Sequence, residues 1–291
     1  DTLNEDYGRF LGNLINHFIK KNKIQKIDFI ASHGHTIFHQ PKNGYTLQIG
    51  DGQQISNTTN LKVICDFRTQ DVELKGQGAP LVPIGDRLLF NEYDYCLNLG
   101  GFANISYEEN GKRLAYDVCP VNIVLNHYVR KLGYNYDNLG LIASEGVCNE
   151  KLLQELNRLS FYKESPPKSL GLEWVKANIF TLIDSYDIEV KDILRTFIEH
   201  ISIQITNQFQ EESKSVLVTG GGVFNEFLLS RIIQMTKARI VIPEKDTIEY
   251  KEALIFAFLG LLKEQKKVNV LSSVTGAKKD HSSGQIFIPK N

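Results

Sequence analysis

The chain has 291 residues, of which 42% are hydrophobic and 23% are charged, which is typical of a folded globular protein and not of a disordered one. This length is sufficient for two ordinary domains. The formal net charge of -1 gives no electrostatic reason to expect nucleic acid or an anionic membrane as a partner.

The first third of the chain alternates between helical and strand patterns. Hydrophobic residues at helical spacing predict an amphipathic helix over 7–22. The following segments predict a short buried strand at 26–32, a strand at 44–49, a short helix at 52–57 and a strand at 61–67. This order indicates an α/β architecture.

A domain junction is expected near 90–94, and three short strands joined by Gly and Asn-Gly turns follow it. The strands are predicted at 95–100, 102–107 and 113–117. The later elements predicted are helices at 121–132, 149–159 and 190–209, a buried strand at 215–219, a helix from Asn225, a strand at 239–242 and a helix at 249–263.

Cysteine usage favours a reducing compartment. Cys65, Cys96, Cys119 and Cys148 form no Cys-x-x-Cys pair, so a disulfide framework or thiolate metal site is not expected. No apolar stretch is long enough to span a bilayer, and the acidic start is unlike a signal peptide. We therefore expect a cytoplasmic protein, and a start without Met suggests that the chain begins inside a longer one.

Two glycine-rich segments follow buried strands. Gly220, Gly221 and Gly222 lead from a strand to a helix start at Asn225, where a ligand could approach the backbone closely and meet free N–H groups. The alternative is a tight turn without a ligand, although three glycines in a row cost chain entropy. Gly100 and Gly101 bend a hairpin that could surround a phosphate or could be ordinary.

Two charged residues are candidates for chemistry. Asp117, at the end of a predicted strand, suits a general base and suits equally an N-cap for the helix after Pro120. Arg68 could hold a carboxylate or phosphate in a bidentate contact, or form a structural pair with Asp66. The Gly-rich segment 76–83 suits either a substrate lid or a plain connector.

Three histidines lie close together in the sequence. His33, His35 and His39 could be metal ligands, but no acid or cysteine nearby completes the set, so no metal site is expected from them. We favour a polar loop that contacts a sugar.

Taken together, these segments resemble the anhydro-N-acetylmuramic acid kinase family. The matching strings run in order over almost the whole chain and are Ser-His-Gly-His-Thr at 32–36, Leu-Gln-Ile-Gly-Asp at 47–51, Cys-Asp-Phe-Arg at 65–68, Gly-Gln-Gly-Ala-Pro-Leu-Val-Pro at 76–83, Asn-Leu-Gly-Gly-Phe-Ala-Asn at 98–104, Asp117 with Pro120 and Asn122, Pro-Lys-Ser-Leu-Gly-Leu-Glu at 167–173, the three glycines with Asn225, Glu252 with Ala253, and Ser-Val-Thr-Gly-Ala at 273–277.

The resemblance implies the fold and the reaction. The family belongs to the actin, hexokinase and Hsp70 superfamily, with two ribonuclease-H-like domains around a cleft. The implied domains are 1–91, incomplete at its N-terminus, and 92–291, whose last helix and tail could pack back on the first. The implied reaction uses ATP and Mg²⁺ to open 1,6-anhydro-N-acetylmuramic acid and form N-acetylmuramic acid 6-phosphate during peptidoglycan recycling. A homodimer is left open.

The resemblance also implies roles for individual residues. Asp117 would be the base that takes a proton from the water attacking the anomeric carbon, while the sugar's O6 receives the γ-phosphoryl group. The implied sugar-binding residues are Arg68, His33, Gly34, His35, Thr36 and Asn122. The implied nucleotide-binding residues are Gly100, Gly101, Asn104, Gly220, Gly221, Gly222 and Asn225.

The chain departs from the family pattern in three places. The family's opening Gly-Thr-Ser-x-Asp-Gly hairpin, which meets the ATP phosphates, is absent. Cys119 and Val121 replace two glycines near Asp117, so we expect a different backbone approach there, with a valine side chain lining the turn. His35 stands in place of a glutamine and could change a sugar hydrogen bond. Two alternatives therefore remain: another sugar kinase of the superfamily, or a non-catalytic sugar-binding remnant.

Overall fold

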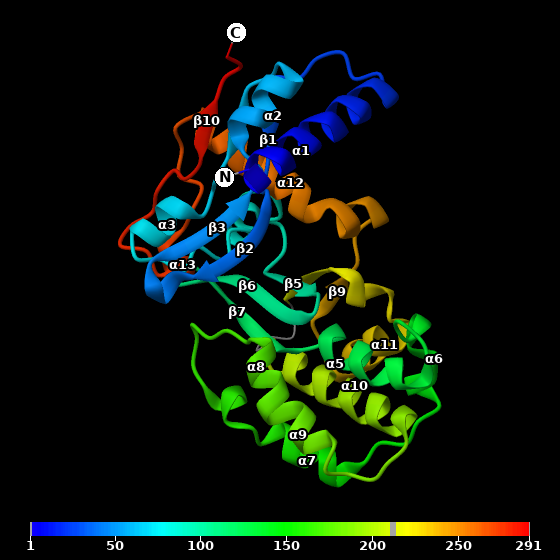
Figure 1. Cartoon of the computed structure of the whole chain (residues 1–291). Helices are drawn as coiled ribbons and strands as arrows, with labels where there is room; N and C mark the ends of the chain where they lie inside the picture. Colours follow the sequence, from blue (N-terminus) through cyan, green and yellow to red (C-terminus); the bar gives the residue numbers. More distant parts are fainter. Residues whose placement is uncertain (1, 210–213, 291) are drawn as a thin grey trace. The chain divides into compact units, whose positions relative to one another are not determined.

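The computed structural model describes residues 2–209 and 214–290, and it divides into two compact units (Figure 1). Unit 1 consists of residues 1–89 and 252–291, and unit 2 of residues 90–251. Residues 252–291 thus group with the first part of the chain. The implied domains 1–91 and 92–291 stay a prediction.

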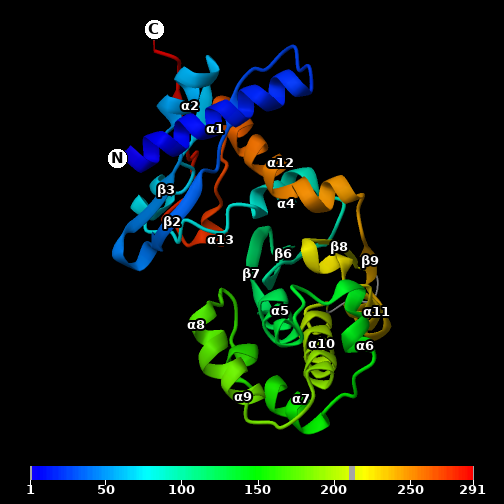
Figure 2. The same cartoon turned by 45° about the vertical axis from the view of Figure 1, so that its right-hand side comes forward.

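Unit 1 begins with α1 (Thr2–Lys21), which packs against α2 (Gly52–Thr59), and Figures 1 and 2 show the two helices side by side. The close approach depends on two buried glycines of α1. A β-carbon on Gly8 would lie 2.8 Å from the carbonyl oxygen of Asp51, and one on Gly12 would lie 2.6 Å from Thr58 Cβ. The helix predicted at 7–22 is confirmed, and it begins five residues earlier than predicted.

The strands of unit 1 form a three-stranded sheet and a separate hairpin. In the sheet, β4 (Val63–Cys65) lies between the parallel strand β1 (Ile30–Ala31) and the antiparallel strand β10 (Gln285–Phe287). The hairpin pairs β2 (His35–Gln40) with β3 (Tyr45–Ile49). The expectation of a polar loop was wrong from His35 onward, because these residues pair with β3 as a strand. Of the predicted strand 26–32, only Ile30 and Ala31 are in a strand.

The helices and turns of unit 1 surround these strands. Besides α1 and α2, they are η1 (Pro41–Asn43), α3 (Thr69–Glu73), α4 (Pro83–Leu89), α13 (Ser272–Thr275) and most of α12 (Lys245–Glu264), which contains the division between the units. The Gly-rich segment 76–83 joins α3 to α4, and its last residue begins α4.

Unit 2 is built on a five-stranded sheet with the order β7-β6-β5-β8-β9. The strands are β5 (Tyr95–Leu99), β6 (Phe102–Glu109), β7 (Lys112–Pro120), β8 (Ser215–Thr219) and β9 (Arg239–Val241). β5, β6 and β7 are antiparallel, whereas β8 and β9 continue the sheet in parallel from β5. This is the arrangement expected of a ribonuclease-H-like domain, and it confirms the α/β prediction.

The predicted Asn-Gly turn between β6 and β7 is confirmed. Asn110 and Gly111 both have positive φ, 50° and 74°, as a tight hairpin turn requires.

Helices cover the sheet of unit 2, and the longest of them, α10 (Val190–Thr206), is mostly buried. α10 packs against α5 (Asn122–Val129), α6 (Leu141–Ser144), α7 (Glu150–Asn157) and α11 (Glu226–Met235). The remaining helical segments are η2 (Arg130–Leu132), η3 (Asn138–Gly140), η4 (Ser160–Lys163), α8 (Leu172–Trp174), the π-helix η5 (Val175–Phe180), α9 (Thr181–Ile183) and η6 (Gly221–Phe224).

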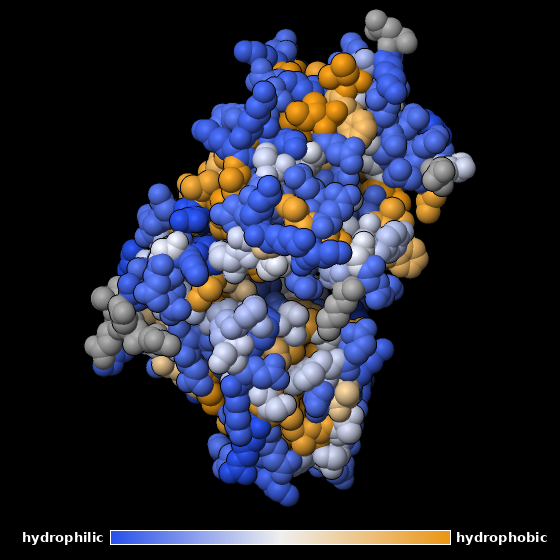
Figure 3. Space-filling view, turned by 90° about the vertical axis from the view of Figure 1, so that its left-hand side faces the viewer, coloured by the Kyte–Doolittle hydropathy of each residue, from blue (hydrophilic) through white to orange (hydrophobic). Residues whose placement is uncertain are grey.

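Most of the surface seen in Figure 3 is hydrophilic, with hydrophobic side chains in separate patches. Side chains of β5, β7, β8, α5 and α10 form the main core of unit 2. Within the described residues, we find no helix with the length and apolar character needed to cross a bilayer.

Candidate functional site

In unit 1, Arg68 connects two of the predicted sugar-binding segments. Its Nη2 lies 2.7 Å from His33 Nε2, and its Nη1 donates to the carbonyl oxygen of Gly78 at 2.7 Å. A guanidinium can only donate, so His33 Nε2 accepts, and Nδ1 carries the proton and donates to the Gly34 carbonyl at 3.1 Å. Burial, and then the positive charge of Arg68, lower the pKa of His33, which keeps the ring neutral.

The other sugar-binding candidates of unit 1 have distinct environments. Gly34 has a φ of +71°, and a β-carbon there would lie 2.5 Å from the carbonyl oxygen of Ile49. Thr36 Oγ1 accepts from Gln48 Nε2 at 3.3 Å. His35 is exposed, with its ring edge-on to Tyr7 at 6.3 Å between centroids.

These contacts divide the sugar-binding set. His35 and Thr36 are successive strand residues and therefore point to opposite faces of the hairpin. Of the side chains in the set, only those of His33 and Arg68 are seen in contact with each other in the described residues. Asn122 belongs to unit 2.

Arg68 does not form the structural pair with Asp66 that the sequence left open. The carboxylate of Asp66 accepts instead from the Thr69 hydroxyl and from Gln285 Nε2. Burial lowers the pKa of the Arg68 guanidinium, and the carboxylates of Glu252 and Asp71 counteract this effect. Arg68 is therefore a partly buried cation with two acidic side chains in its surroundings.

In unit 2, the bend between β5 and β6 holds the start of α5. The Gly101 carbonyl accepts from Val121 N at 2.8 Å, and the Gly100 carbonyl accepts from Asn122 N at 3.3 Å. The first N–H groups of α5 therefore bind the hairpin. Gly101 itself is exposed, and the nearest atom to a β-carbon there would be 4.0 Å away, which leaves room for a ligand.

The two glycine replacements in the family motif are accommodated in the interior. Val121 and Cys119 are fully buried in the core of unit 2. The Val121 backbone has a φ of -129°, a value that does not require glycine. The expectation that the valine side chain lines the turn was wrong, because the side chain packs into the core instead.

Asp117 lies within β7, which continues to Pro120, and so not at the strand end as predicted. It is not the N-cap of α5 either, since Val121 occupies that position. Its backbone N–H donates to the Lys168 carbonyl at 3.1 Å, and its Oδ2 accepts from Leu170 N at 2.8 Å. Burial raises the pKa of Asp117, and the Leu170 N–H opposes this shift in part.

The three glycines after β8 have different surroundings. A β-carbon on Gly220 would lie 2.6 Å from Asn98 Oδ1, and one on Gly222 would lie 2.7 Å from Leu99 Cβ. These two glycines therefore allow close packing against β5. Gly221 is exposed, and nothing would lie within 4 Å of its β-carbon, so it is the one of the three whose surroundings suit a ligand.

Two asparagines complete the predicted nucleotide set. Asn225 is buried and caps α11, with its Oδ1 accepting from Leu228 N at 2.9 Å. Asn104 is exposed on β6 and lies opposite Asp117 in the register, next to a bulge in the β6–β7 ladder. The sheet thus places a nucleotide candidate beside the candidate base.

The described residues contain no group of three or more His, Cys, Asp or Glu side chains that could hold a metal ion. The cysteines are free, and burial raises the pKa of the Cys65 thiol to about 12.

Sequence reasoning gave no role to several residues that support the candidates. Lys168 and Leu170 bind the backbone and carboxylate of Asp117, and Thr275 and Asp71 lie beside the Gly78 loop. Lys168 and Leu170 lie in the string at 167–173, and Thr275 lies in the string at 273–277. These two strings matched the family, and that match was the signal that could have drawn attention to three of the four.

Comparison with known proteins gives matches to one family over almost the whole chain. A model of the anhydro-N-acetylmuramic acid kinase family matches residues 1–289. An anhydro-N-acetylmuramic acid kinase of Mannheimia succiniciproducens is 33% identical over 98% of this chain and 82% of its own length. One of Coxiella burnetii is 33% identical over 96% of this chain and 80% of its own length. The activator of 2-hydroxyisocaproyl-CoA dehydratase from Clostridium difficile aligns with a TM-score of 0.41 at 13% identity, over 76% of this chain and 87% of that one.

Proposed function

Because this chain belongs to the anhydro-N-acetylmuramic acid kinase family, a family of phosphotransferases that use ATP, we propose that it acts on 1,6-anhydro-N-acetylmuramic acid. Water opens the anhydro bridge at the anomeric carbon while O6 receives the γ-phosphoryl group of ATP. The product is N-acetylmuramic acid 6-phosphate, formed in peptidoglycan recycling. The observation that carries the proposal is the match of the family model to residues 1–289.

Asp117 is the proposed general base. Its Oδ2 is held by the Leu170 N–H at 2.8 Å, so Oδ1 is the oxygen that would take the proton from the attacking water. A base works best when its pKa approaches the operating pH, and burial moves the pKa of Asp117 in that direction. The environment of Asp117 therefore suits proton abstraction.

Arg68 and His33 are the proposed sugar contacts in unit 1, together with Gly34, His35 and Thr36. Arg68 can donate to the polar oxygens of the sugar or its lactyl carboxylate, and a planar guanidinium fits a carboxylate well. Asn122 is the proposed sugar contact of unit 2. Since the backbone N–H of Asn122 binds Gly100, its side chain would make the contact.

The proposed nucleotide contacts lie on unit 2, and the open surroundings of Gly101 and Gly221 fit the approach of a phosphate or a base. Gly100, Gly220 and Gly222 are neighbours of these two glycines in the sequence and belong to the same proposed set. Asn104 and Asn225, each three residues beyond a glycine of the set, complete it. Mg²⁺ would neutralise phosphate charge when bound.

The test is a coupled assay of the intact protein with ATP and the anhydro sugar, with glucose and N-acetylglucosamine as control substrates. We expect N-acetylmuramic acid 6-phosphate only from the anhydro sugar. Equal phosphorylation of glucose would favour a different sugar kinase, and sugar binding without any turnover would favour a non-catalytic protein. The cytoplasmic location and the homodimer stay predictions, and the mass of the protein in solution tests the second.

A further inference from the structure

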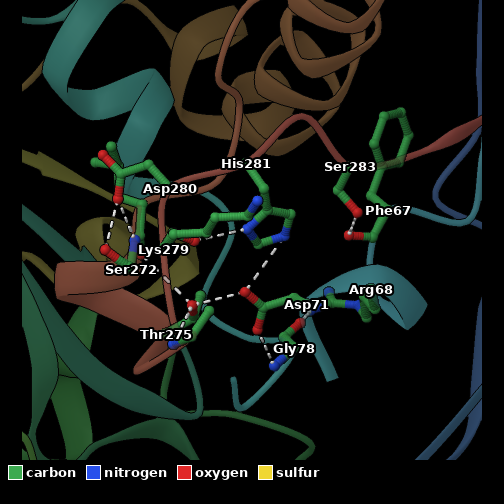
Figure 4. A network of polar contacts seen from close by, with 12 residues as sticks. Phe67, Arg68, Asp71, Gly78, Ser272, Thr275, Lys279, Asp280, His281 and Ser283 are labelled. Carbon is green, nitrogen blue, oxygen red and sulfur yellow. Dashed lines mark hydrogen bonds and ion pairs between the residues drawn. The ribbon is translucent and has the colours of Figure 1, made fainter. Parts of the chain in front are cut away.

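The carboxylate of Asp71 is fully buried in unit 1 and lies among three polar groups (Figure 4). Its Oδ2 accepts from the backbone N–H of Gly78 at 2.6 Å, and its Oδ1 accepts from the Thr275 hydroxyl at 2.7 Å. His281 Nε2 lies 3.5 Å from the same Oδ1. An uncompensated buried carboxylate would be costly, so these partners are needed for Asp71 to remain there.

The Gly-rich loop is shaped around this carboxylate. Gly76 N donates to the Asp71 carbonyl at 2.8 Å, and a β-carbon on Gly76 would clash with the Asp71 carboxylate itself. Gly78 has a φ of +67°, a conformation that favours glycine. The two glycines therefore let the loop wrap around Asp71, which explains why residues of this type stand at these positions.

The segment 275–283 closes over the other side of the loop. Gln77 N donates to the Thr275 carbonyl at 2.8 Å, and Lys278 N donates to the Leu74 carbonyl at 3.0 Å. The Ser283 hydroxyl donates to the Phe67 carbonyl at 2.7 Å. Two main-chain hydrogen bonds and the Ser283 hydroxyl thus hold this distant segment against the region around Asp71.

Gly78 connects Asp71 to Arg68. Its N–H binds the Asp71 carboxylate, and its carbonyl accepts from Arg68 Nη1 at 2.7 Å. The other terminal nitrogen of Arg68 binds His33 at 2.7 Å. A shift of the Gly78 backbone would therefore move the guanidinium and change its contact with His33.

We propose that Asp71, supported by Thr275, is a positioning residue that fixes the Gly78 backbone and thereby orients the Arg68 guanidinium toward the sugar. The inference rests on the proposed function for one point only, the assignment of Arg68 to the sugar. Asp71 acts through Gly78 and needs no contact with substrate.

The test compares Asp71→Asn, Thr275→Val and the matched control Thr275→Ser in the intact protein. Asparagine retains the shape of Asp71 but loses the charge and one acceptor, and charge-assisted hydrogen bonds are worth enough for an effect of about tenfold or more. We expect the Kd for the anhydro sugar, measured by calorimetry, to rise about tenfold for Asp71→Asn and less for Thr275→Val. The Kd for ATP should not change, and Thr275→Ser should behave as the wild type because serine retains the hydroxyl.

A readout without substrate separates this inference from the proposed function. In an NMR titration, loss of the Arg68 contact should bring the pKa of His33 closer to its ordinary value in both disruptive variants. If the wild type binds no anhydro sugar, the proposed function fails while the His33 titration still tests the positioning. A folded Asp71→Asn with wild-type His33 titration would overturn the inference, and if that variant does not fold, the same result for Thr275→Val would do so.

Discussion

Replacement of Asp117 by asparagine tests the catalytic assignment most directly. The amide oxygen of asparagine can accept from the Leu170 N–H as the carboxylate does at 2.8 Å, so the backbone of β7 should not move. What is lost is the ability to take a proton. General-base catalysis contributes roughly 10²- to 10⁴-fold, which corresponds to about 3 to 5 kcal/mol of transition-state stabilisation. We therefore expect kcat to fall by at least about 100-fold.

The assay is formation of N-acetylmuramic acid 6-phosphate from the anhydro sugar and ATP, together with calorimetric binding of ATP. ATP affinity should stay at the wild-type value, and Asp187→Asn, which alters an exposed aspartate of unit 2, is the matched control. In the wild type, kcat/KM should fall as pH drops through the pKa of Asp117. Because burial raises this pKa above the ordinary 3.8, the fall should begin at a higher pH than for an exposed aspartate. Full turnover by Asp117→Asn would refute the base assignment.

Four further substitutions test the packing and the protonation of buried groups in the two units. Gly222→Ala should cost about 1 to 3 kcal/mol of folding free energy in urea unfolding, because its β-carbon would lie 2.7 Å from Leu99, whereas Gly221→Ala should leave stability almost unchanged and weaken ATP binding. Burial lowers the pKa of His200 to about 3, so the folded state binds a proton less readily than the unfolded state, and stability should fall by about 2 kcal/mol between pH 6.5 and 5. His200→Asn should remove that slope, and an unchanged slope would contradict the argument. Gly12→Ala should lower the melting temperature, since its β-carbon would lie 2.6 Å from a side chain of α2, and an unchanged value would show that α1 and α2 can separate at little cost.

The sheet of unit 2 was predictable because its strands carry local signals. Strands 95–99 and 215–219 are apolar runs bounded by glycine, and the Asn-Gly pair at 110–111 marks a hairpin. A strand whose two faces are both buried appears as a continuous apolar run, and a tight turn appears as an Asn-Gly pair. Both signals are local, so they predict the elements without knowledge of distant residues.

The hairpin of unit 1 was harder to predict. Most residues of β2 are exposed, and His-Thr-Ile-Phe-His-Gln shows no alternation of polar and apolar residues. Its pairing with β3 is what makes it a strand, and a register shift between Thr36 and Phe38 further obscures the pattern.

The surroundings of the site residues depend on contacts between distant segments. Asp71 and Thr275 are 204 positions apart, and Asp117 is bound by a backbone group 53 positions away. The sequence could suggest Arg68 and Asp117 by type and by resemblance. It could not show which groups hold them, since backbone N–H and carbonyl groups leave no trace in residue identity.

The division of the chain also affects the order in which it can fold during synthesis. Unit 2 is one continuous stretch, so all of its contacts are available once residue 251 has left the ribosome. Unit 1 cannot complete its sheet until β10 is added, and the Asp71 carboxylate lacks the Thr275 hydroxyl until α13 has been synthesised. Residues 252–291 of unit 1 are therefore synthesised after all of unit 2. In a nascent chain that lacks them, unit 2 could already be folded, whereas Asp71 and the Gly78 loop beside Arg68 would still lack their contacts with Thr275.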